Sequence, residues 1–169
     1  MTRTRLRVVF FGEPASTFSR LHLAVLRQST DVVLWVHSPR AGHAMPRSGF
    51  RSPRDLVSRL AVRAALEAHA MRCLGRPAAM LGEPAGPVYA AARRDPHLAA
   101  RVAAAAPDLL ISAAFGQILP TAVLATARLG GFNCHPSPLP RYAGSNPWFW
   151  ILKGGETQSA VTVHRMVDI

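Results

Sequence analysis

The sequence has few of the residue types that mark metal-binding and disulfide-rich proteins. It contains two cysteines, Cys73 and Cys134, which lie far apart and do not show the spacing of metal ligands. No metal site and no disulfide framework are therefore expected. Reduced thiols in a cytoplasmic protein are the prediction.

Long apolar runs and a dinucleotide signature are also missing. No apolar stretch approaches the ~20 residues that a membrane helix needs, so no membrane partner is expected. The basic start leads into a short apolar run that ends at Gly12 without a small-residue cleavage pattern, which argues against a signal peptide. The same turn lacks Gly-x-Gly-x-x-Gly, which argues against a dehydrogenase that uses nicotinamide or flavin.

Lysine is almost absent, and Lys153 is the only one in the sequence. The formal net charge is nevertheless +11. The positive charge therefore comes from arginines, and these are scattered along the sequence. Three interpretations stay open: a nucleic-acid surface, a site for an anionic ligand, or a compositional habit of an arginine- and alanine-rich chain.

The length and the apolar content predict one packed domain. The chain has 169 residues, of which 49% are hydrophobic, and this is enough for a core. We therefore treat residues 1–169 as a single domain, in which residues 38–54 form a loop rich in Pro, Gly, Arg and His. The loop carries four arginines that either meet an anionic substrate or face solvent: Arg40, Arg47, Arg51 and Arg54.

Apolar runs and helical patterns alternate along the chain. Leu6–Phe11 is typical of a buried parallel strand, Ser16 of a helix N-cap, and Val32–Val36 of a second strand, which together form a βαβ unit. Further strands are expected near residues 79–81, 108–115, 129–135 and 159–166, and helices over residues 56–73, 89–105, 120–127 and 146–153. This order predicts an α/β fold, Rossmann-like and doubly wound, with a mostly parallel sheet and helices on both faces.

The stretch with the clearest chemistry follows the strand that ends near residue 135. Asn133 and His135 are two residues apart, so a strand places both side chains on one face and turns Cys134 to the other, where we expect it to be buried and inert. An amide donor beside an imidazole acid or base suits acyl transfer. Taken singly, the first residue is also a common turn former and the second a common structural histidine.

These residues belong to a longer pattern. It comprises Asn133-x-His135-x-Ser137-x-Leu139-Pro140, then Gly144, Pro147, Gly155-Glu156 and Val161-Thr162-x-His164-x-Met166, preceded by Ser112-Ala-Ala-Phe-Gly-Gln-Ile-Leu-Pro120. The pattern resembles that of the formyltransferases that use N10-formyltetrahydrofolate, over nearly the whole chain. That family acts on methionyl-tRNA, glycinamide ribonucleotide or amino sugars, and includes a formyltetrahydrofolate hydrolase.

The resemblance implies roles residue by residue. Asn133 matches the catalytic amide that donates to the formyl oxygen of a tetrahedral intermediate, and His135 matches the catalytic imidazole. Two segments match those that border the folate co-substrate: Gly116, Gln117, Ile118 and Leu119, and Ser137, Pro138, Leu139 and Pro140. We expect His164 to be structural or to line the site. Trp148, Phe149 and Trp150 are expected to pack in the core, with a platform that stacks on a ligand as the alternative.

The match also has gaps. The resemblance implies an aspartate that orients the imidazole, and its position falls just beyond Ile169, so a truncated family member is expected and this chain alone is expected to be inactive. Asp168 matches an earlier acidic position and takes the role only if the register slips. Pro138, Ala143 and Ala160 stand where the family has Leu, Arg and Gly.

The resemblance leaves the formyl acceptor open. The loop at residues 114–120 is similar to that of the methionyl-tRNA enzymes, whereas residues 145–148 and 162–164 are closer to the enzymes for amino-sugar nucleotides. A hydrolase that uses water as acceptor and an inactive folate-binding module are the alternatives.

Overall fold

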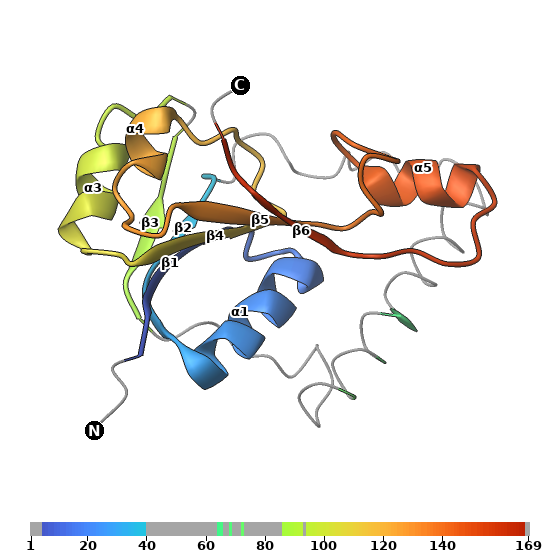
Figure 1. Cartoon of the computed structure of the whole chain (residues 1–169), viewed down its shortest axis with the longest axis horizontal. Helices are drawn as coiled ribbons and strands as arrows, with labels where there is room; N and C mark the ends of the chain where they lie inside the picture. Colours follow the sequence, from blue (N-terminus) through green and yellow to red (C-terminus); the bar gives the residue numbers. More distant parts are fainter. Residues whose placement is uncertain are drawn as a thin grey trace.

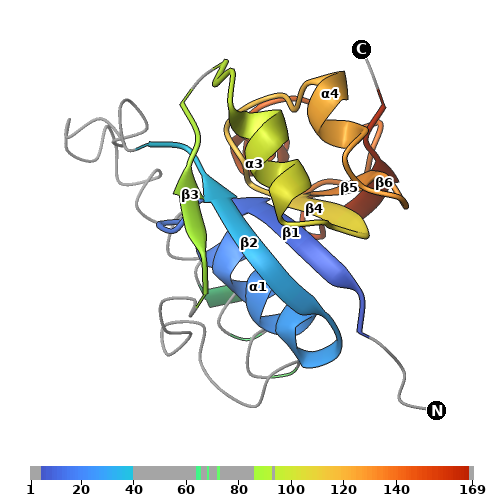
Figure 2. The ribbon, with the colours of Figure 1, turned by 90° about the vertical axis from the view of Figure 1, so that its left-hand side faces the viewer.

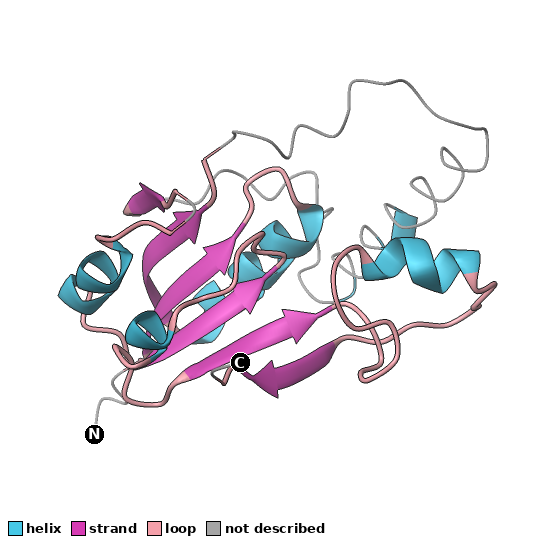
Figure 3. Cartoon of the chain, turned by 90° about the horizontal axis from the view of Figure 1, so that it is seen from above, coloured by secondary structure: helices cyan, strands magenta, loops and turns pink. Residues whose placement is uncertain are grey.

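The computed structural model describes residues 5–39, 64–65, 68, 72, 86–92 and 94–167. In chain order the elements are β1 (Arg7–Gly12), α1 (Thr17–Ser29), β2 (Asp31–His37), β3 (Val88–Ala90), α3 (Leu98–Ala104), β4 (Leu109–Ala113), α4 (Thr121–Leu124), β5 (Gly131–His135), α5 (Pro147–Lys153) and β6 (Thr162–Arg165). Within the described residues, six strands form one sheet in the order β3-β2-β1-β4-β5-β6. All neighbours pair in parallel except β5 and β6, and in Figure 3 the arrow of β6 runs against the others.

Strand β1 lies in the middle of the sheet and is buried on both faces. Its side chains alternate between two apolar clusters: Val9 and Phe11 belong to one, Val8 and Phe10 to the other, and all four are fully buried. A strand covered on both faces reads as a continuous apolar run, which is why the sequence pattern identified it.

Helices cover both faces of the sheet, as predicted. Figures 1 and 2 show α1 on one face and α3 and α4 on the other. The N-cap prediction at Ser16 is confirmed, because its hydroxyl oxygen accepts a hydrogen bond from the N–H of Ser19. Helix α5 lies beyond the carboxyl end of β5 (Figure 3) and joins α1 through Trp148, whose ring meets that of Phe18 edge-on at 6.3 Å.

The helix predicted over residues 89–105 is wrong in its first half. Tyr89 lies in β3, the outermost strand on that side, and the helix begins only at Leu98. The alanine-rich composition favours a helix, but the phenol of Tyr89 is bonded to the carboxylate of Asp95 at 2.5 Å and Ala91 is fully buried. Tertiary contacts therefore override the local propensity.

Two of the three aromatic residues expected in the core are exposed instead. Phe149 and Trp150 on α5 expose 50% and 48% of their surface, and only Trp148 is partly buried. The helix is short and contacts the rest of the described chain along one face, so its other aromatic side chains remain outside.

Some predictions fall outside the described residues: the strand near residues 79–81, all but the start of the loop at residues 38–54, and most of the helix at residues 56–73. Ala64, Ala65, Ala68 and Arg72 within that last range are helical. None of the helices in the described ranges has the length and apolar content needed to span a bilayer.

Candidate active site

The candidate site lies on the sheet face that carries α3 and α4. Cys134 belongs to the apolar cluster on the opposite face, beside Phe18, so the neighbouring residues Asn133 and His135 point to the α3 side. Cys134 is buried as predicted, and burial raises the pKa of its thiol. The alternation expected from the sequence is therefore present, while the catalytic roles of the two residues stay predictions.

The pairing of β5 with β6 places two more polar side chains beside the amide and the imidazole, so that four lie together. Asn133 stands opposite His164, and His135 stands opposite Thr162. On the other side of β5, Ser112 of β4 pairs with Asn133. Three polar residues thus form a row across three strands at one level of the sheet: Ser112, Asn133 and His164.

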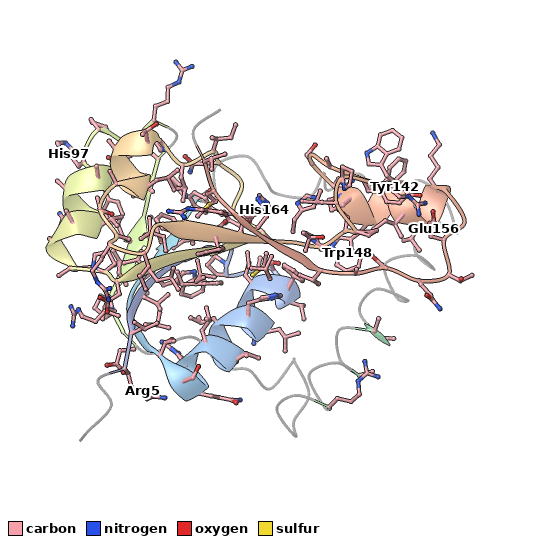
Figure 4. All side chains as sticks on the ribbon, in the orientation of Figure 1. Arg5, His97, Tyr142, Trp148, Glu156 and His164 are labelled. Atoms are coloured by element: carbon pink, nitrogen blue, oxygen red, sulfur yellow. The ribbon has the colours of Figure 1, made fainter. Side chains whose placement is uncertain are left out.

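The amide of Asn133 has a fixed partner. Its Nδ2 donates to Nε2 of His164 at 3.2 Å, and Nδ1 of the same ring lies 3.1 Å from the carbonyl oxygen of Arg165. A carbonyl can only accept, so Nδ1 carries the ring hydrogen and Nε2 of the neutral ring offers a lone pair. Figure 4 shows His164 at the centre of the molecule, where β5 and β6 cross the view.

The imidazole of His135 is held by the loop that follows it. Its Nε2 lies 3.2 Å from the carbonyl oxygen of Tyr142, and the same reasoning places a hydrogen on Nε2. Nδ1 of the neutral ring is then the nitrogen free to accept a proton. Within residues 5–39, 86–92 and 94–167, no carboxylate bonds to this ring, and Asp168 lies outside the described residues.

The backbone N–H groups of the segment Ser137–Pro140 are already hydrogen-bonded within the protein. Ser137 N–H donates to the carbonyl of His135 at 2.9 Å, and Leu139 N–H donates to the carbonyl of Ser137 at 3.0 Å and to Oγ1 of Thr162 at 3.1 Å. Pro138 and Pro140 have no N–H. This segment can therefore meet a ligand only through carbonyl oxygens and apolar side-chain atoms.

The buried hydroxyl of Ser137 is also used internally. It donates to the carbonyl oxygens of Arg141 and Tyr142 at 3.1 and 3.2 Å, and the side chain is fully buried. The serine closes the turn whose Tyr142 carbonyl holds His135. Its position gives the serine a structural role, and the expected role beside the co-substrate stays a prediction.

The loop at residues 116–119 differs from residues 137–140 in its backbone N–H groups. In the part of the chain that the structure describes, the N–H groups of Gln117, Ile118 and Leu119 donate to no protein acceptor. The side chain of Gln117 is engaged, because its Nε2 donates to Oγ of Ser38 at 3.1 Å and to the carbonyl of Ala91 at 2.9 Å. These bonds tie the loop to the carboxyl ends of β2 and β3 and leave its backbone open.

A cavity of about 250 Å³ joins this loop to the polar row. Its polar lining residues are Ser112, Gln117, Asn133, His164 and Arg165, and its apolar ones include Phe115, Ile118, Leu119 and Leu124. It therefore brings three of the eight expected co-substrate residues together with the amide. His135 and Ser137–Pro140 lie outside the cavity lining, and so does Gly116.

A second, shallower cavity of about 360 Å³ lies on the far side of the molecule, against α3. Tyr89, His97, Ala100 and Arg101 line it, and Figure 4 shows His97 well away from His164. No residue of the predicted site reaches it. Of these two cavities, the smaller one is lined by residues of the predicted site.

A further polar cluster fixes the loop after β5. The hydroxyl of Tyr142 donates to Oε1 of Glu156 at 2.6 Å, and Arg141 forms an ion pair with the same carboxylate. The Tyr142 hydrogen bond, and then Arg141, hold the pKa of Glu156 below its usual value. Figure 4 shows Tyr142 and Glu156 together beside α5, so this cluster anchors the loop and lies apart from the cavity.

The sequence did not indicate the parts played by Ser112 and Thr162, nor the hydrogen bond that the Asn133 amide donates to His164. Ser112, Thr162 and His164 all lie in the pattern quoted for the resemblance. Their alternation with apolar neighbours in predicted strands indicates one inward face, but the register that brings them together could not be read from one sequence. The described residues contain no group of three or more His, Cys, Asp or Glu that could hold a metal ion.

The chain belongs to the formyl transferase family, whose model matches residues 6–169. Members of this family are enzymes that take the formyl group from N10-formyltetrahydrofolate. The resemblance stated from the sequence is therefore confirmed, as is the predicted fold class.

The relatives of this chain within the family include methionyl-tRNA formyltransferases. The chain is 33% identical over 162 residues to the one from Synechococcus sp. (strain JA-3-3Ab), which is 95% of this chain and 44% of that protein. It therefore spans less than half the length of that relative.

Solved structures share the fold at low sequence identity. Glycinamide ribonucleotide transformylase 1 from Symbiobacterium toebii matches with a TM-score of 0.61 and 17% identity, over 96% of this chain and 66% of that one. A formyltetrahydrofolate deformylase from Pseudomonas syringae pv. tomato matches with a TM-score of 0.61 and 18% identity, over 98% of this chain and 47% of that one. At this identity the likeness establishes the fold alone.

Proposed function

We propose that residues 1–169 form the catalytic domain of an enzyme that transfers a formyl group from N10-formyltetrahydrofolate to a primary amine. One observation carries the proposal above the others. Asn133 and His135 share one face of β5, with the amide in the wall of the 250 Å³ cavity. This is the pair of groups that acyl transfer needs: a donor for the developing oxyanion and a carrier for the proton.

The amide of Asn133 supplies the donor. Nδ2 has two hydrogens, and His164 accepts only one, so the second is free for the formyl oxygen as it gains negative charge. A donor that is already oriented costs no reorganisation at the moment of reaction. Removal of one such donor typically costs about 10²–10³ in turnover.

The imidazole of His135 moves the proton. The amine nitrogen attacks the formyl carbon and forms a C–N bond, and its proton passes to the unprotonated Nδ1 of His135. The bond from the formyl carbon to N10 then breaks, and the departing nitrogen takes the proton. The Nε2–H group stays on the carbonyl of Tyr142 throughout, so Nδ1 is the nitrogen that takes up and releases the proton.

The cavity suits the ring system of the folate. Its apolar wall can hold a flat heterocycle, and the open N–H groups of residues 117–119 can meet the amide-like edge of that ring. A volume of about 250 Å³ matches a ring system more than a whole folate. The segment at residues 137–140 would border the co-substrate through Pro138, Leu139 and Pro140 rather than through backbone donors.

We propose initiator methionyl-tRNA as the acceptor. The support is the 33% identity to a methionyl-tRNA formyltransferase over 95% of the chain and the net charge of +11, which suits a phosphate backbone. An enzyme of this kind would act in the cytoplasm. Ser145-Asn146-Pro147-Trp148 keeps an amino-sugar nucleotide as the second acceptor to test.

The test is a formyl-transfer assay with this chain and with a chain continued past Ile169. The donor is N10-formyltetrahydrofolate, offered with methionyl-tRNA, with an amino-sugar nucleotide, or with no acceptor. Formyl-methionyl-tRNA as the main product supports the full proposal. A formylated sugar as the main product would show that the acceptor is an amino-sugar nucleotide and not methionyl-tRNA. Release of formate without an acceptor would indicate a hydrolase. Binding of the co-substrate without turnover would indicate an inactive module.

A further inference from the structure

The imidazole of His164 holds one edge of the Asn133 amide. Asn133 and His164 are directly opposite each other on β5 and β6, and Nδ2 of the amide lies 3.2 Å from Nε2 of the ring. Both side chains line the same cavity. This contact joins two strands at the point where the proposed chemistry takes place.

The hydrogens at this contact can be assigned from the partners. The carbonyl of Arg165 lies 3.1 Å from Nδ1 of His164 and can only accept, so Nδ1 carries the ring hydrogen. The bond made by one ring nitrogen fixes what the other can do. Nε2 is then an acceptor, and it must face the NH₂ end of the amide rather than its oxygen.

The amide orientation matters because the two ends of the group have opposite effects. If the amide turned over, its oxygen would lie beside the lone pair of Nε2, and the two acceptors would repel each other. The NH₂ end would then leave the position in the cavity wall that it now occupies. An oxyanion is stabilised only by donors placed where its charge develops.

We propose that His164 is a positioning residue, which fixes the rotamer of the Asn133 amide so that one N–H remains directed to the reacting oxygen. The proposal rests on the function proposed above for Asn133. It assigns to His164 no proton transfer and no contact with the substrate. The Nδ1–H tautomer is part of it, because the other tautomer would remove the acceptor.

Three variants separate this role from a general structural one. His164→Leu removes the acceptor with little change in volume. His164→Gln places Oε1 near the position of Nε2 and can restore the bond. His97→Leu, at the exposed start of α3, is the matched control for loss of a histidine far from the site.

The first measurement is made on the ¹⁵N-labelled 169-residue chain and requires no activity. Long-range ¹H–¹⁵N spectra should place the hydrogen of the His164 ring on Nδ1, and a hydrogen on Nε2 would overturn the proposal. Exchange of the Asn133 side-chain hydrogen that is bonded to His164 should become at least ~10-fold faster in His164→Leu, return to within about threefold in His164→Gln, and stay unchanged in His97→Leu. Unchanged exchange in His164→Leu would also overturn it.

The second measurement is turnover in a chain continued past Ile169. In His164→Leu, kcat should fall about 10–100-fold, the range typical for loss of a group that orients a reacting one, while KM for N10-formyltetrahydrofolate changes less than about threefold. His164→Gln should recover most of kcat. Normal kcat in His164→Leu would refute the positioning role. Absence of formyl transfer in the unmutated chain would refute the proposed function and leave the tautomer result intact.

Discussion

Thr162 is the best place to test how the sheet holds the loop after β5. Its hydroxyl donates to the carbonyl oxygen of Ser137 at 2.7 Å and accepts from the N–H of Leu139 at 3.1 Å. Thr162→Val keeps the shape and the β-branched side chain, which favours a strand, but removes both bonds. Any effect therefore comes from the loss of the hydroxyl.

The expected cost follows from the partners that remain. A neutral intramolecular hydrogen bond contributes about 0.5–1.5 kcal/mol net, so two bonds give about 1–3 kcal/mol. Leu139 N–H keeps its bond to the Ser137 carbonyl at 3.0 Å, and Thr162 is only half-buried, so neither group is left wholly unsatisfied. We therefore expect a loss of about 2 kcal/mol in the free energy of unfolding.

Urea unfolding at neutral pH measures this directly. With a slope of about 2 kcal/mol/M, a loss of about 2 kcal/mol lowers the midpoint by about 1 M and leaves the slope unchanged. Thr157→Val, at an exposed position beyond the loop, is the control and should stay within about 0.5 kcal/mol. If Thr162→Val also stays within that limit, the two bonds do not anchor the loop and the reasoning is wrong.

The remaining predictions concern the chemistry, the core and the pH response. Asn133→Ala and His135→Ala should each lower formyl transfer at least ~100-fold in a chain continued past Ile169, and near-normal turnover in either would remove that residue from the catalytic assignment. Gly12→Ala should destabilise the fold by about 1–3 kcal/mol in urea, because a Cβ there would lie 2.7 Å from Cε1 of the buried Phe10 ring and 3.0 Å from the carbonyl oxygen of Ala113. In a Cys73→Ser background the Cys134 thiol should alkylate at least ~100-fold more slowly in buffer than in urea, since it is buried and its pKa is raised; equal rates would show that it is accessible. The pKa of Glu156 is lowered in the folded chain, so its contribution to stability is present above the unfolded pKa of about 4.3 and is lost as the pH falls through the folded value. Glu156→Gln should therefore flatten the acid side of the stability curve, and an unchanged curve would show that the cluster does not form in solution.

The sequence could predict the elements whose environment is uniform along their length. β1 and β4 are buried on both faces, so each is a continuous apolar run between turn residues. β3 could not be predicted, because it has three residues, is exposed at both ends, and is held by its pairing with β2 and by the bond from Tyr89 to Asp95. Val88 and Tyr89 favour a strand, but a segment of three residues is too short to stand out beside the alanine-rich, helix-favouring stretch that follows it.

The candidate site also has one feature that the sequence could predict and one that it could not. The shared face of Asn133 and His135 follows from the two-residue period of a strand and needs no tertiary information. The cavity wall, by contrast, depends on the antiparallel register of β6, which sets His164 rather than Arg165 opposite the amide. A shift of one residue would turn the side chain of Val163 or Arg165 to this face, and both residues are exposed in the structure.

Strand β6 acts on both chemical groups from one side of the sheet. His164 and Thr162 are two residues apart on its inner face, opposite Asn133 and His135 respectively. His164 bonds directly to the amide, while Thr162 holds the loop whose Tyr142 carbonyl accepts from the imidazole. β6 is the last strand of the described sheet and pairs on one edge only, so its position relies on β5 and on the bonds of these two side chains. The contacts made by His164 and Thr162 therefore orient Asn133 and His135 and also hold β6 in place. Loss of either contact should weaken the placement of both Asn133 and His135.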